Sequence, residues 1–410
     1  MKYSEINKCR ISGSENLITV LDLGFHALTG VFPRKLNQQV TTGPLRLVWC
    51  PESELLQLQH SYELGEMYGD NYGYRSGLNN SMVSHLKQKV KNLLRLCPIY
   101  EGDIAVDIGS NDGTLLKGYN TQGVKLVGID PTGSKFKKYY GDNIELIPDF
   151  FSAINYHKHF NKPAKIITSI SMFYDLESPP LFVKDISEIL DVNGIWHFEQ
   201  SYLLTMLSMN SYDTVCHEHL EYYTLGVVKK LLEKFDLRII DVQLNAINGG
   251  SFAITAAHKK SSYISNDAVI NWMLGQEDRM GFNTLRPFRQ FEERVFAHRQ
   301  NLIKLIRDLR SDGNIVIGYG ASTKGNVLLQ FCGLTNNDIS CIAEVNPDKF
   351  GSFTPGTNIP IISETEAKKI KPDYMLVLPW HFRDEIIKKE LEYLSSGGKL
   401  IFPLPEIEII

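Results

Sequence analysis

Short apolar stretches of strand type alternate with helical segments along this chain, and this alternation limits its fold more than any other feature. In a first run they lie at residues 104–106, 126–129, 166–167 and 195–198, with helix-like segments between them. A second run has them at residues 314–317, 339–343, 374–378 and 399–402. Strands separated by helices of about 10 to 15 residues are typical of βαβ units and parallel sheets. The pattern therefore predicts two Rossmann-like α/β units.

Other segments frame these two units. Turn-rich sequence with a strand-like run at 45–49 fills the first sixty or so residues and favours a small β module. Apolar residues recur with helical spacing over 81–96, and again over 288–309. We expect the second stretch to be a connecting helix packed against both neighbours. A coiled-coil dimer face, the alternative, needs a more sustained heptad repeat.

Composition excludes several classes of protein. The 410 residues hold 43 Lys and Arg against 47 Asp and Glu, a net charge of −4, which offers no basic surface to nucleic acid or anionic lipid. No stretch reaches the ~18 apolar residues of a membrane span, and the first residues lack the apolar core of a signal peptide. Six cysteines are too few for a disulfide scaffold. We expect a soluble, cytoplasmic protein with no nucleic-acid or membrane partner.

The N-terminal module contains the remains of a metal-site pattern. Cys9 and Ser12, and again Cys50 and Ser53, have the spacing of two C-x-x-C knuckles of a zinc ribbon in which each second thiol is a serine. Zinc prefers four thiolate or imidazole ligands, and an un-ionised hydroxyl is a poor substitute. We therefore expect no zinc in this module.

The turn after residue 106 points to a cationic ligand. Asp107 ends the strand, glycines follow at 109 and 113, and Asp112 lies inside the turn. A dinucleotide fold would have G-x-G-x-x-G and place a diphosphate there, which acids would repel. Asp130 ends the next strand, where a carboxylate can accept both hydroxyls of a ribose. An ordinary strand–helix corner with a capping aspartate is the alternative.

These features resemble the S-adenosylmethionine site of class I methyltransferases, whose ligand carries a sulfonium and an ammonium. The segment 149–151 follows the third strand-like region, where such enzymes often hold adenine, although a Phe pair is more often part of a core. We assign to the cofactor Asp107, Gly109, Asn111, Asp112, Gly113, Asp130, Asp149, Phe150 and Phe151.

A cluster of His, Glu and Tyr occupies residues 212–223. A metal site would need further ligands, and the helical H-E-x-x-H spacing is missing. A structural cluster of half-buried side chains is a second interpretation. An acid–base centre fits best, because imidazole titrates near neutral pH and its neighbours can fix its tautomer. Such a base could remove a proton next to a ketone and give an enolate for methylation at carbon.

Six motifs in order then resemble the sugar C-methyltransferases of deoxysugar biosynthesis; they lie at residues 74–82, 107–116, 172–177, 212–223, 248–252 and 318–326. Enzymes of that family methylate C3 of a nucleotide-linked 4-keto-6-deoxyhexose. The resemblance covers nearly the whole chain. It implies a zinc-ribbon-like module at 1–65, a class I methyltransferase domain at 66–260, and a linker helix with a nucleotide-sugar-binding α/β domain at 261–410.

The resemblance also implies roles for particular residues. His219 corresponds to the family's general base, Glu218 and His217 would orient or support it, and Tyr72 and Tyr74 would polarise the ketone. A turn whose tyrosines cover the edge of the core is the alternative for the last two. Cys216 stands where some members have a tyrosine, and Asn248 stands where some have a histidine, which leaves open the sugar and the position of its ketone.

The turn at 318–326 combines glycines, hydroxyls and one lysine at a helix start, which suits the diphosphate of a nucleotide sugar. A plain helix cap is the alternative. Trp380 follows a strand at the sheet edge where ligands bind, and it could stack a nucleobase. The residues assigned to the substrate are Asn248, Ser251, Tyr222, Ser322, Thr323, Lys324, Asn326 and Trp380.

The leading hypothesis is therefore S-adenosylmethionine-dependent C-methylation of a nucleotide-linked keto-deoxysugar. An O-methyltransferase on the same scaffold and a non-catalytic nucleotide-sugar-binding protein are the alternatives, and a nicotinamide oxidoreductase comes after them. The sequence does not predict the oligomeric state.

Overall fold

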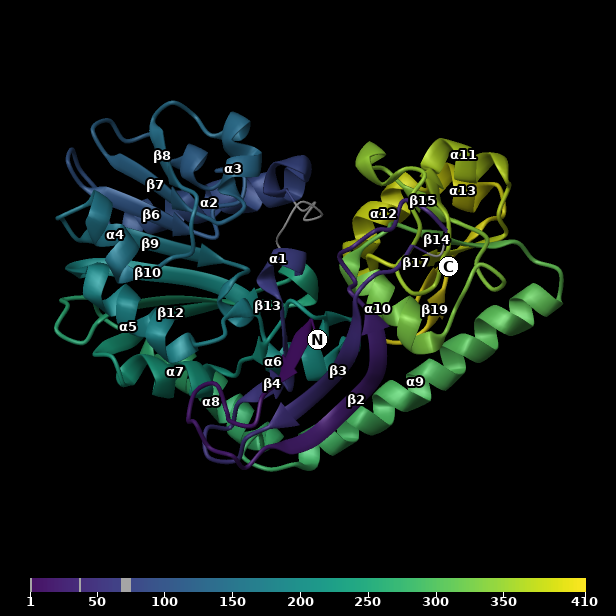
Figure 1. Ribbon diagram of the computed structural model, residues 1–410, viewed down its shortest axis with the longest axis horizontal. Coiled ribbons are helices and arrows are strands. Elements are labelled where there is room, and N and C mark those ends of the chain that lie inside the picture. Colours follow the sequence, from purple (N-terminus) through teal and green to yellow (C-terminus); the bar gives the residue numbers. More distant parts are fainter. Residues whose placement is uncertain (1, 37, 68–74) are drawn as a thin grey trace.

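The computed structural model of the protein describes residues 2–36, 38–67 and 75–410 (Figure 1). Two α/β units lie on either side of the molecule, and the long N-terminal strands and one long helix run between them (Figure 1). The mixed α/β class and the two Rossmann-like units predicted from the alternation are confirmed.

The N-terminal module is built on a four-stranded sheet in the order β11-β4-β3-β2. Its antiparallel strands are β2 (Ile18–Ala27), β3 (Thr42–Trp49), β4 (Leu56–Leu58) and β11 (Glu221–Tyr222). A second small sheet pairs β1 (Tyr3–Glu5) with β5 (His60–Tyr62), and α1 (Leu64–Met67) follows it. Because β11 comes from the central part of the chain, residues 1–65 do not close this sheet alone.

The central unit is a seven-stranded sheet in the order β12-β13-β10-β9-β6-β7-β8. Its strands are β6 (Ile104–Ile108), β7 (Lys125–Ile129), β8 (Ile144–Ile147), β9 (Ala164–Ile170), β10 (Leu190–Ser201), β12 (Leu237–Asn245) and β13 (Ser251–His258). Strands β6 to β10 are parallel, whereas β13 is antiparallel to both of its neighbours. Chain order reverses at β6, and ligands of open α/β sheets bind at such a switch point.

Helices cover this sheet. They are α2 (Asn80–Leu96), α3 (Gly133–Phe136), α4 (Ala153–His159), α5 (Pro179–Ile189) and α7 (Leu225–Glu233). Helix α6 (Leu203–Ser208) instead packs against the turn 212–214 and the long helix that follows later in the chain. The helix predicted over 81–96 is α2. The Asn79 side chain caps it by accepting the backbone N–H of Ser81, and its buried face carries Leu86, Val90 and Leu93 at helical spacing.

Two helices link the α/β units: α8 (Asp267–Met280), which ends at Gly281 in the left-handed conformation, and α9 (Arg286–Ser311). Helix α9 buries one stripe, including Phe288, Val295 and Leu302, in a core shared with the N-terminal strands and the C-terminal sheet. It runs alongside β2 toward the C-terminal unit (Figure 1). The connecting helix expected over 288–309 is therefore confirmed.

The C-terminal unit is a six-stranded sheet in the order β16-β15-β14-β17-β18-β19, parallel except for β19. Its strands are β14 (Val316–Tyr319), β15 (Ile342–Glu344), β16 (Ile361–Ser363), β17 (Tyr374–Val377), β18 (Lys399–Phe402) and β19 (Glu408–Ile409). Its helices are α10 (Thr323–Cys332), α11 (Glu364–Lys369), α12 (Arg383–Lys389) and α13 (Leu391–Ser395). Among the described residues, no helix has the length and apolar character needed to cross a membrane.

Candidate active site

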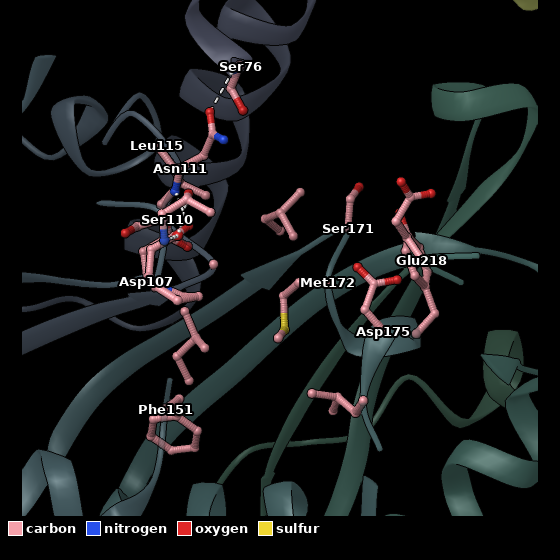
Figure 2. Close-up of a pocket in the computed structure, with 18 of the residues that line it drawn as sticks. Ser76, Asp107, Ser110, Asn111, Leu115, Phe151, Ser171, Met172, Asp175 and Glu218 are labelled. Atoms are coloured by element: carbon pink, nitrogen blue, oxygen red, sulfur yellow. Dashed lines mark hydrogen bonds between the residues drawn. The ribbon is translucent and has the colours of Figure 1, made fainter. Parts of the chain in front are cut away.

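A cavity of about 510 Å³ opens where the central sheet meets the C-terminal unit. Side chains that follow β6, β7 and β9 form one part of its wall, and Cys216, Glu218, His219, Asn248 and the start of α10 complete it. Asp107, Ser110 and Asn111 lie on one wall and Asp175 and Glu218 on the opposite one, as Figure 2 shows. The volume is in the range of about 300 to 1,000 Å³ that is usual for small-molecule sites.

The glycine turn after β6 forms the wall next to the sheet. Gly109 has φ of +72°, and Asn111 and Gly113 also have positive φ values of +52° and +71°. A Cβ atom at Gly109 would lie 3.0 Å from the side chain of Met172, so only glycine fits between this turn and the loop after β9. The turn thus brings main chain close to any ligand in the cavity.

Asp107 places a carboxyl group on the cavity wall although its side chain is almost fully buried. Burial raises the pKa of Asp107 to about 7; the nearby charge of Asp130 raises it further, and the hydrogen bond donated by the Thr168 hydroxyl, 2.6 Å away, opposes this rise. A buried carboxyl group of this kind gains from a cation in the cavity, which favours its ionised form.

Asp130, at the end of β7, also lines the cavity. One carboxylate oxygen accepts the backbone N–H of Asn111 at 2.8 Å, and the other accepts the N–H and the hydroxyl of Thr132, each at 2.6 Å. Each oxygen can accept more than one hydrogen bond, so this rigidly held carboxylate suits the hydroxyls of a ribose.

The remaining residues assigned to the cofactor divide into two groups. Phe150 and Phe151 line the cavity, and the Phe151 ring packs edge-on against Phe182. Asp149 instead lies at the surface, where it accepts from Asn155. Asp149 is therefore not placed to contact a ligand in the cavity.

Asp112 is also turned away from the cavity. Its carboxylate accepts the backbone N–H of Gly77 at 3.0 Å and the hydroxyl of Thr114 at 2.5 Å, and it lies 3.4 Å from the guanidinium of Arg75. Gly113 packs against the ring of Tyr140. These two residues hold the turn and the segment before α2, which corrects their assignment as cofactor contacts.

His219 lines the cavity, and its geometry defines its tautomer. Its Nδ1 lies 2.8 Å from the carbonyl oxygen of Thr214. Because a carbonyl only accepts, Nδ1 carries the hydrogen, and in the neutral ring Nε2 keeps a free lone pair. Burial lowers the pKa of His219 to about 4, the bond to Thr214 opposes this, and the charge of Lys324 adds to it. The ring is therefore neutral at pH 7.

The two residues before His219 point in different directions. Glu218 lines the cavity, and one of its carboxylate oxygens approaches Gly30 so closely that a Cβ there would lie 2.8 Å away. Burial raises the pKa of Glu218. His217 is fully buried on the other side and packs edge-on against Tyr62 of the N-terminal module. This contact gives His217 a structural position instead of the orienting role expected for it.

The three tyrosines named from the sequence are not seen at the large cavity. Tyr72 and Tyr74 lie outside the described residues. Tyr222 lies in β11 and is 4% exposed, beside a small cavity of about 10 Å³ behind His219. Its assignment to the substrate is not supported by this position, because the small cavity has room for about one water molecule.

The start of α10 contributes the cationic part of the site. Thr323 and Lys324 line the cavity, and the Lys324 ammonium donates to the carbonyl oxygen of Asn248 at 2.7 Å. Burial lowers the pKa of Lys324, and the charge of Asp213 opposes this. Ser322 caps its own helix by accepting the N–H of Gly325, as the plain-cap alternative predicts.

Three of the residues assigned to the substrate hold neighbouring segments instead. Asn326 is fully buried and donates to the carbonyl of Thr29. Ser251 donates to the carbonyl of Ile247. Trp380 is 5% exposed, and its Nε1–H donates to Asp213 at 2.8 Å. So little exposed ring surface cannot stack a nucleobase in this conformation, whereas Asn248 does line the cavity.

The degenerate metal pattern of the N-terminal module forms a hydrogen-bonded cluster. The Cys9 sulfur lies 3.1 Å from the Ser53 hydroxyl, and the Ser12 hydroxyl lies 3.5 Å from the Cys50 sulfur. Two thiols with two neutral hydroxyls do not fit the needs of zinc. Within residues 2–36, 38–67 and 75–410, no group of three or more His, Cys, Asp or Glu side chains is arranged to hold a metal ion.

Sequence reasoning missed a buried polar network next to the cavity. Glu199, at the end of β10, receives bonds from His85 at 2.7 Å, Lys89 at 2.6 Å and Asn245 at 2.5 Å. Burial would raise the pKa of Glu199, but the hydrogen bonds and charges of His85 and Lys89 lower it to about 2. Such a network depends on side chains from α2, β10 and β12, and no spacing in the sequence indicates it. Ser171, Met172 and Asp175 were also missed, although the motif at 172–177 was one signal for the last two.

Comparison with known proteins places the chain in a family. It is 31% identical over 412 residues to "C-methyltransferase NovU" of Streptomyces niveus, and the alignment covers 99% of this chain and 97% of that protein. Residues 9–68 match the family described as "Putative zinc binding domain", residues 82–242 match "Methyltransferase domain", and residues 246–405 match "C-methyltransferase C-terminal domain".

Solved structures are less similar to this chain in sequence than that relative is. A complex of the Haloferax volcanii Trm112 methyltransferase activator with a putative methyltransferase aligns at 14% identity, covering 44% of this chain and 94% of that chain, with a TM-score of 0.36. The magnesium protoporphyrin IX methyltransferase of Synechocystis with bound SAM aligns at 11% identity over 44% of this chain and 82% of that chain, with a TM-score of 0.33. The family assignment depends instead on the full-length sequence relative and on the matched C-methyltransferase and methyltransferase domains: this chain belongs to the S-adenosylmethionine-dependent C-methyltransferases.

Proposed function

We propose that the enzyme methylates the carbon next to the ketone of a nucleotide-linked keto-deoxysugar, with His219 as the base that removes the proton. The observation that carries this proposal is the 2.8 Å contact between Nδ1 of His219 and the Thr214 carbonyl. It gives the imidazole the tautomer in which Nε2 can accept a proton, on a side chain that lines the cavity.

The cofactor side of the cavity suits S-adenosylmethionine. Asp107 would hold its positive charge, Asp130 its ribose, and Phe150 and Phe151 its adenine. The glycine turn supports this fit, because Gly109, Ser110 and Asn111 bring a tight turn of main chain to the cavity wall. When bound, the cofactor supplies an electrophilic methyl group.

The substrate side offers groups that suit an anionic ligand. Lys324 and Thr323 stand at the start of α10 and line the same cavity as His219. Their ammonium and hydroxyl groups would bind a diphosphate or stabilise the enolate oxygen that gains charge when the proton leaves. Tyr72 and Tyr74 stay candidates for the ketone. The sugar follows from the sequence resemblance, and Asn248 at the cavity wall is the residue through which its identity could be selected.

In the proposed step, Nε2 of His219 takes the proton of the C–H bond next to the ketone. The electrons of that bond form the C=C bond of the enolate, while the π electrons of the C=O bond move onto its oxygen. Nδ1 keeps its hydrogen and its bond to Thr214, which stabilises the imidazolium that forms. Glu218 lines the same part of the cavity and would stabilise that charge when ionised.

The test separates deprotonation from methylation. The enzyme is incubated in deuterated water, without methyl donor, with a panel of dTDP-, GDP- and CDP-linked 4-keto-6-deoxyhexoses, and deuterium uptake is measured by mass spectrometry. We expect uptake next to the ketone with one member of the panel, and loss of uptake in His219→Ala. His159→Ala, at a histidine whose side chain is 43% exposed, is the matched control and should keep the wild-type rate.

A wild-type enzyme that shows no uptake, but methylates an oxygen of the same sugar when the donor is added, would refute the carbon chemistry. Uptake that survives in His219→Ala would refute the assignment of the base while leaving the reaction in place.

A further inference from the structure

A buried hydrogen bond connects the C-terminal unit to the segment that carries the base. The Nε1–H of Trp380, in the 3-10 turn Trp380–Phe382 after β17, donates to a carboxylate oxygen of Asp213 at 2.8 Å. The two residues are 5% and 1% exposed, respectively. Asp213 belongs to another 3-10 turn, Tyr212–Thr214, in the central part of the chain.

That second turn also contains the hydrogen-bond acceptor of His219. Thr214 follows Asp213 directly, and its carbonyl oxygen accepts the Nδ1–H of His219. Tyr212, on the other side of Asp213, lies with its hydroxyl 3.1 Å from Nδ1 of His298 in α9. One short turn therefore fixes the tautomer of the base, and side chains from outside the central sheet hold that turn.

Trp380 also contacts the segment that carries Asn248, a residue of the cavity wall. A Cβ on Gly249 would lie 3.4 Å from its ring, so the indole packs directly on the main chain next to Asn248. The carbonyl of Asn248 in turn accepts the ammonium of Lys324. The ring thus touches both segments that flank the start of α10.

We propose that Trp380 is a positioning residue: through Asp213 it holds the Thr214 carbonyl in place and so keeps His219 in the tautomer with a free Nε2. This inference depends on the proposed role of His219 as the base. Its physical basis is that neutral imidazole has two tautomers, and the bond to the Thr214 carbonyl selects the one with its hydrogen on Nδ1. If the carbonyl moves, the ring can carry its hydrogen on Nε2, where it cannot accept a proton.

The chain offers a matched pair of variants. Trp380→Phe removes the indole N–H and keeps an aromatic ring. Trp49→Phe makes the same change in the N-terminal module at a tryptophan that is 4% exposed, whose Nε1 has no hydrogen-bond partner among the described residues. Both variants lose a similar buried ring volume, but only the first loses a hydrogen bond.

Three measurements are made on each protein. The tautomer of His219 is determined from the ¹⁵N shifts of its ring in histidine-labelled protein, with the signal assigned by its absence in His219→Ala among the 11 histidines. The rate of deuterium uptake by the keto sugar and the Kd for S-adenosylmethionine are then measured. The tautomer measurement needs no substrate, so it separates failure of this inference from failure of the proposed function.

We expect Trp380→Phe to populate the Nε2–H tautomer and to lower the uptake rate ~10²-fold, the usual cost of a misplaced catalytic group, with the Kd for S-adenosylmethionine unchanged. Trp49→Phe should match the wild type. Asp213→Asn keeps an oxygen that accepts the indole N–H and should retain most of the rate, whereas Asp213→Leu should not. Wild-type ¹⁵N shifts in Trp380→Phe would overturn the proposal, as would equal losses in the two tryptophan variants.

Discussion

Protonation of Asp107 should control how tightly the enzyme binds S-adenosylmethionine. Burial raises the pKa of this carboxyl group to about 7 in the protein without ligand. A bound cation favours the ionised form, so the pKa falls in the complex. Binding therefore releases a proton at any pH below about 7, and affinity must rise with pH until Asp107 is ionised before the ligand arrives.

The size of the effect follows from that pKa. Protonation of one group weakens binding by the factor 1 + 10^(pKa − pH), so a pKa of about 7 makes the Kd at pH 5.5 ~30 times the Kd at pH 8. That ratio corresponds to a binding free energy that is weaker by ~2 kcal/mol at the lower pH. Above pH 8 the Kd should be constant.

Isothermal titration calorimetry between pH 5.5 and 8.5 measures this directly. Repeating each titration in buffers with different ionisation enthalpies gives the number of protons released, which should approach one at pH 5.5. Asp107→Asn should bind weakly at every pH and release no proton. Asp142→Asn, at an exposed carboxylate away from the cavity, should reproduce the wild-type curve. A wild-type Kd that does not change over this range would refute the reasoning.

Three further changes test other parts of the structure. Burial is the main cause of the low pKa of His219, and the charge of Lys324 adds to it. Lys324→Gln removes that added charge, so an NMR titration should show the pKa of His219 rising above about 4; an unchanged value would mean the charge is screened. Burial lowers the pKa of His217 from 6.5 to about 3, so between these pH values the unfolded chain binds a proton at this histidine and the folded protein does not. The free energy of unfolding should therefore fall by ~1.4 kcal/mol for each unit that the pH drops in this range. His217→Leu removes this contribution, so its stability in urea melts should fall less steeply from pH 6.5 to 5. Finally, a chelator should not change the melting temperature of the wild-type protein. The double variant Ser12→Cys, Ser53→Cys has four thiol ligands, so elemental analysis should find one zinc ion in it. Zinc bound to the wild type, or no zinc bound to the variant, would contradict this.

The predicted residues that lie at the cavity wall were found from local sequence. A strand followed by a glycine turn and a helix has one basic geometry, so Asp107 and Gly109 could be placed at the cavity without any knowledge of distant contacts. Asp112 shows the limit of that reasoning. It lies in the same turn and has the same charge, but the positive φ at Asn111 directs the chain so that its carboxylate faces the segment before α2. Only the course of the backbone distinguishes the two acids.

Contacts between distant segments were beyond the reach of sequence reasoning. Glu218 touches Gly30 of the N-terminal module, and β11 completes that module's sheet from the central part of the chain. Trp380 was predicted to stack a base because it follows a strand at the ligand-binding edge of the sheet. Its position along the chain was interpreted correctly, but the acceptor that binds its N–H, Asp213, lies 167 residues away. No periodicity in either segment indicates such a pair.

The placement of charge in the cavity explains why two α/β units contribute to one site. The edge of the central sheet presents the carboxylates of Asp107 and Asp130, whereas the start of α10 in the other unit presents the ammonium of Lys324. A cationic methyl donor and an anionic nucleotide sugar would each be drawn to the side of opposite charge, and each would be repelled from the wrong one. His219 lies on the segment between the two units, and its tautomer is fixed by a turn that Trp380 of the C-terminal unit contacts. Separating the two units would therefore remove both the charge pattern proposed to orient the two ligands and the contact proposed to keep His219 ready to accept a proton.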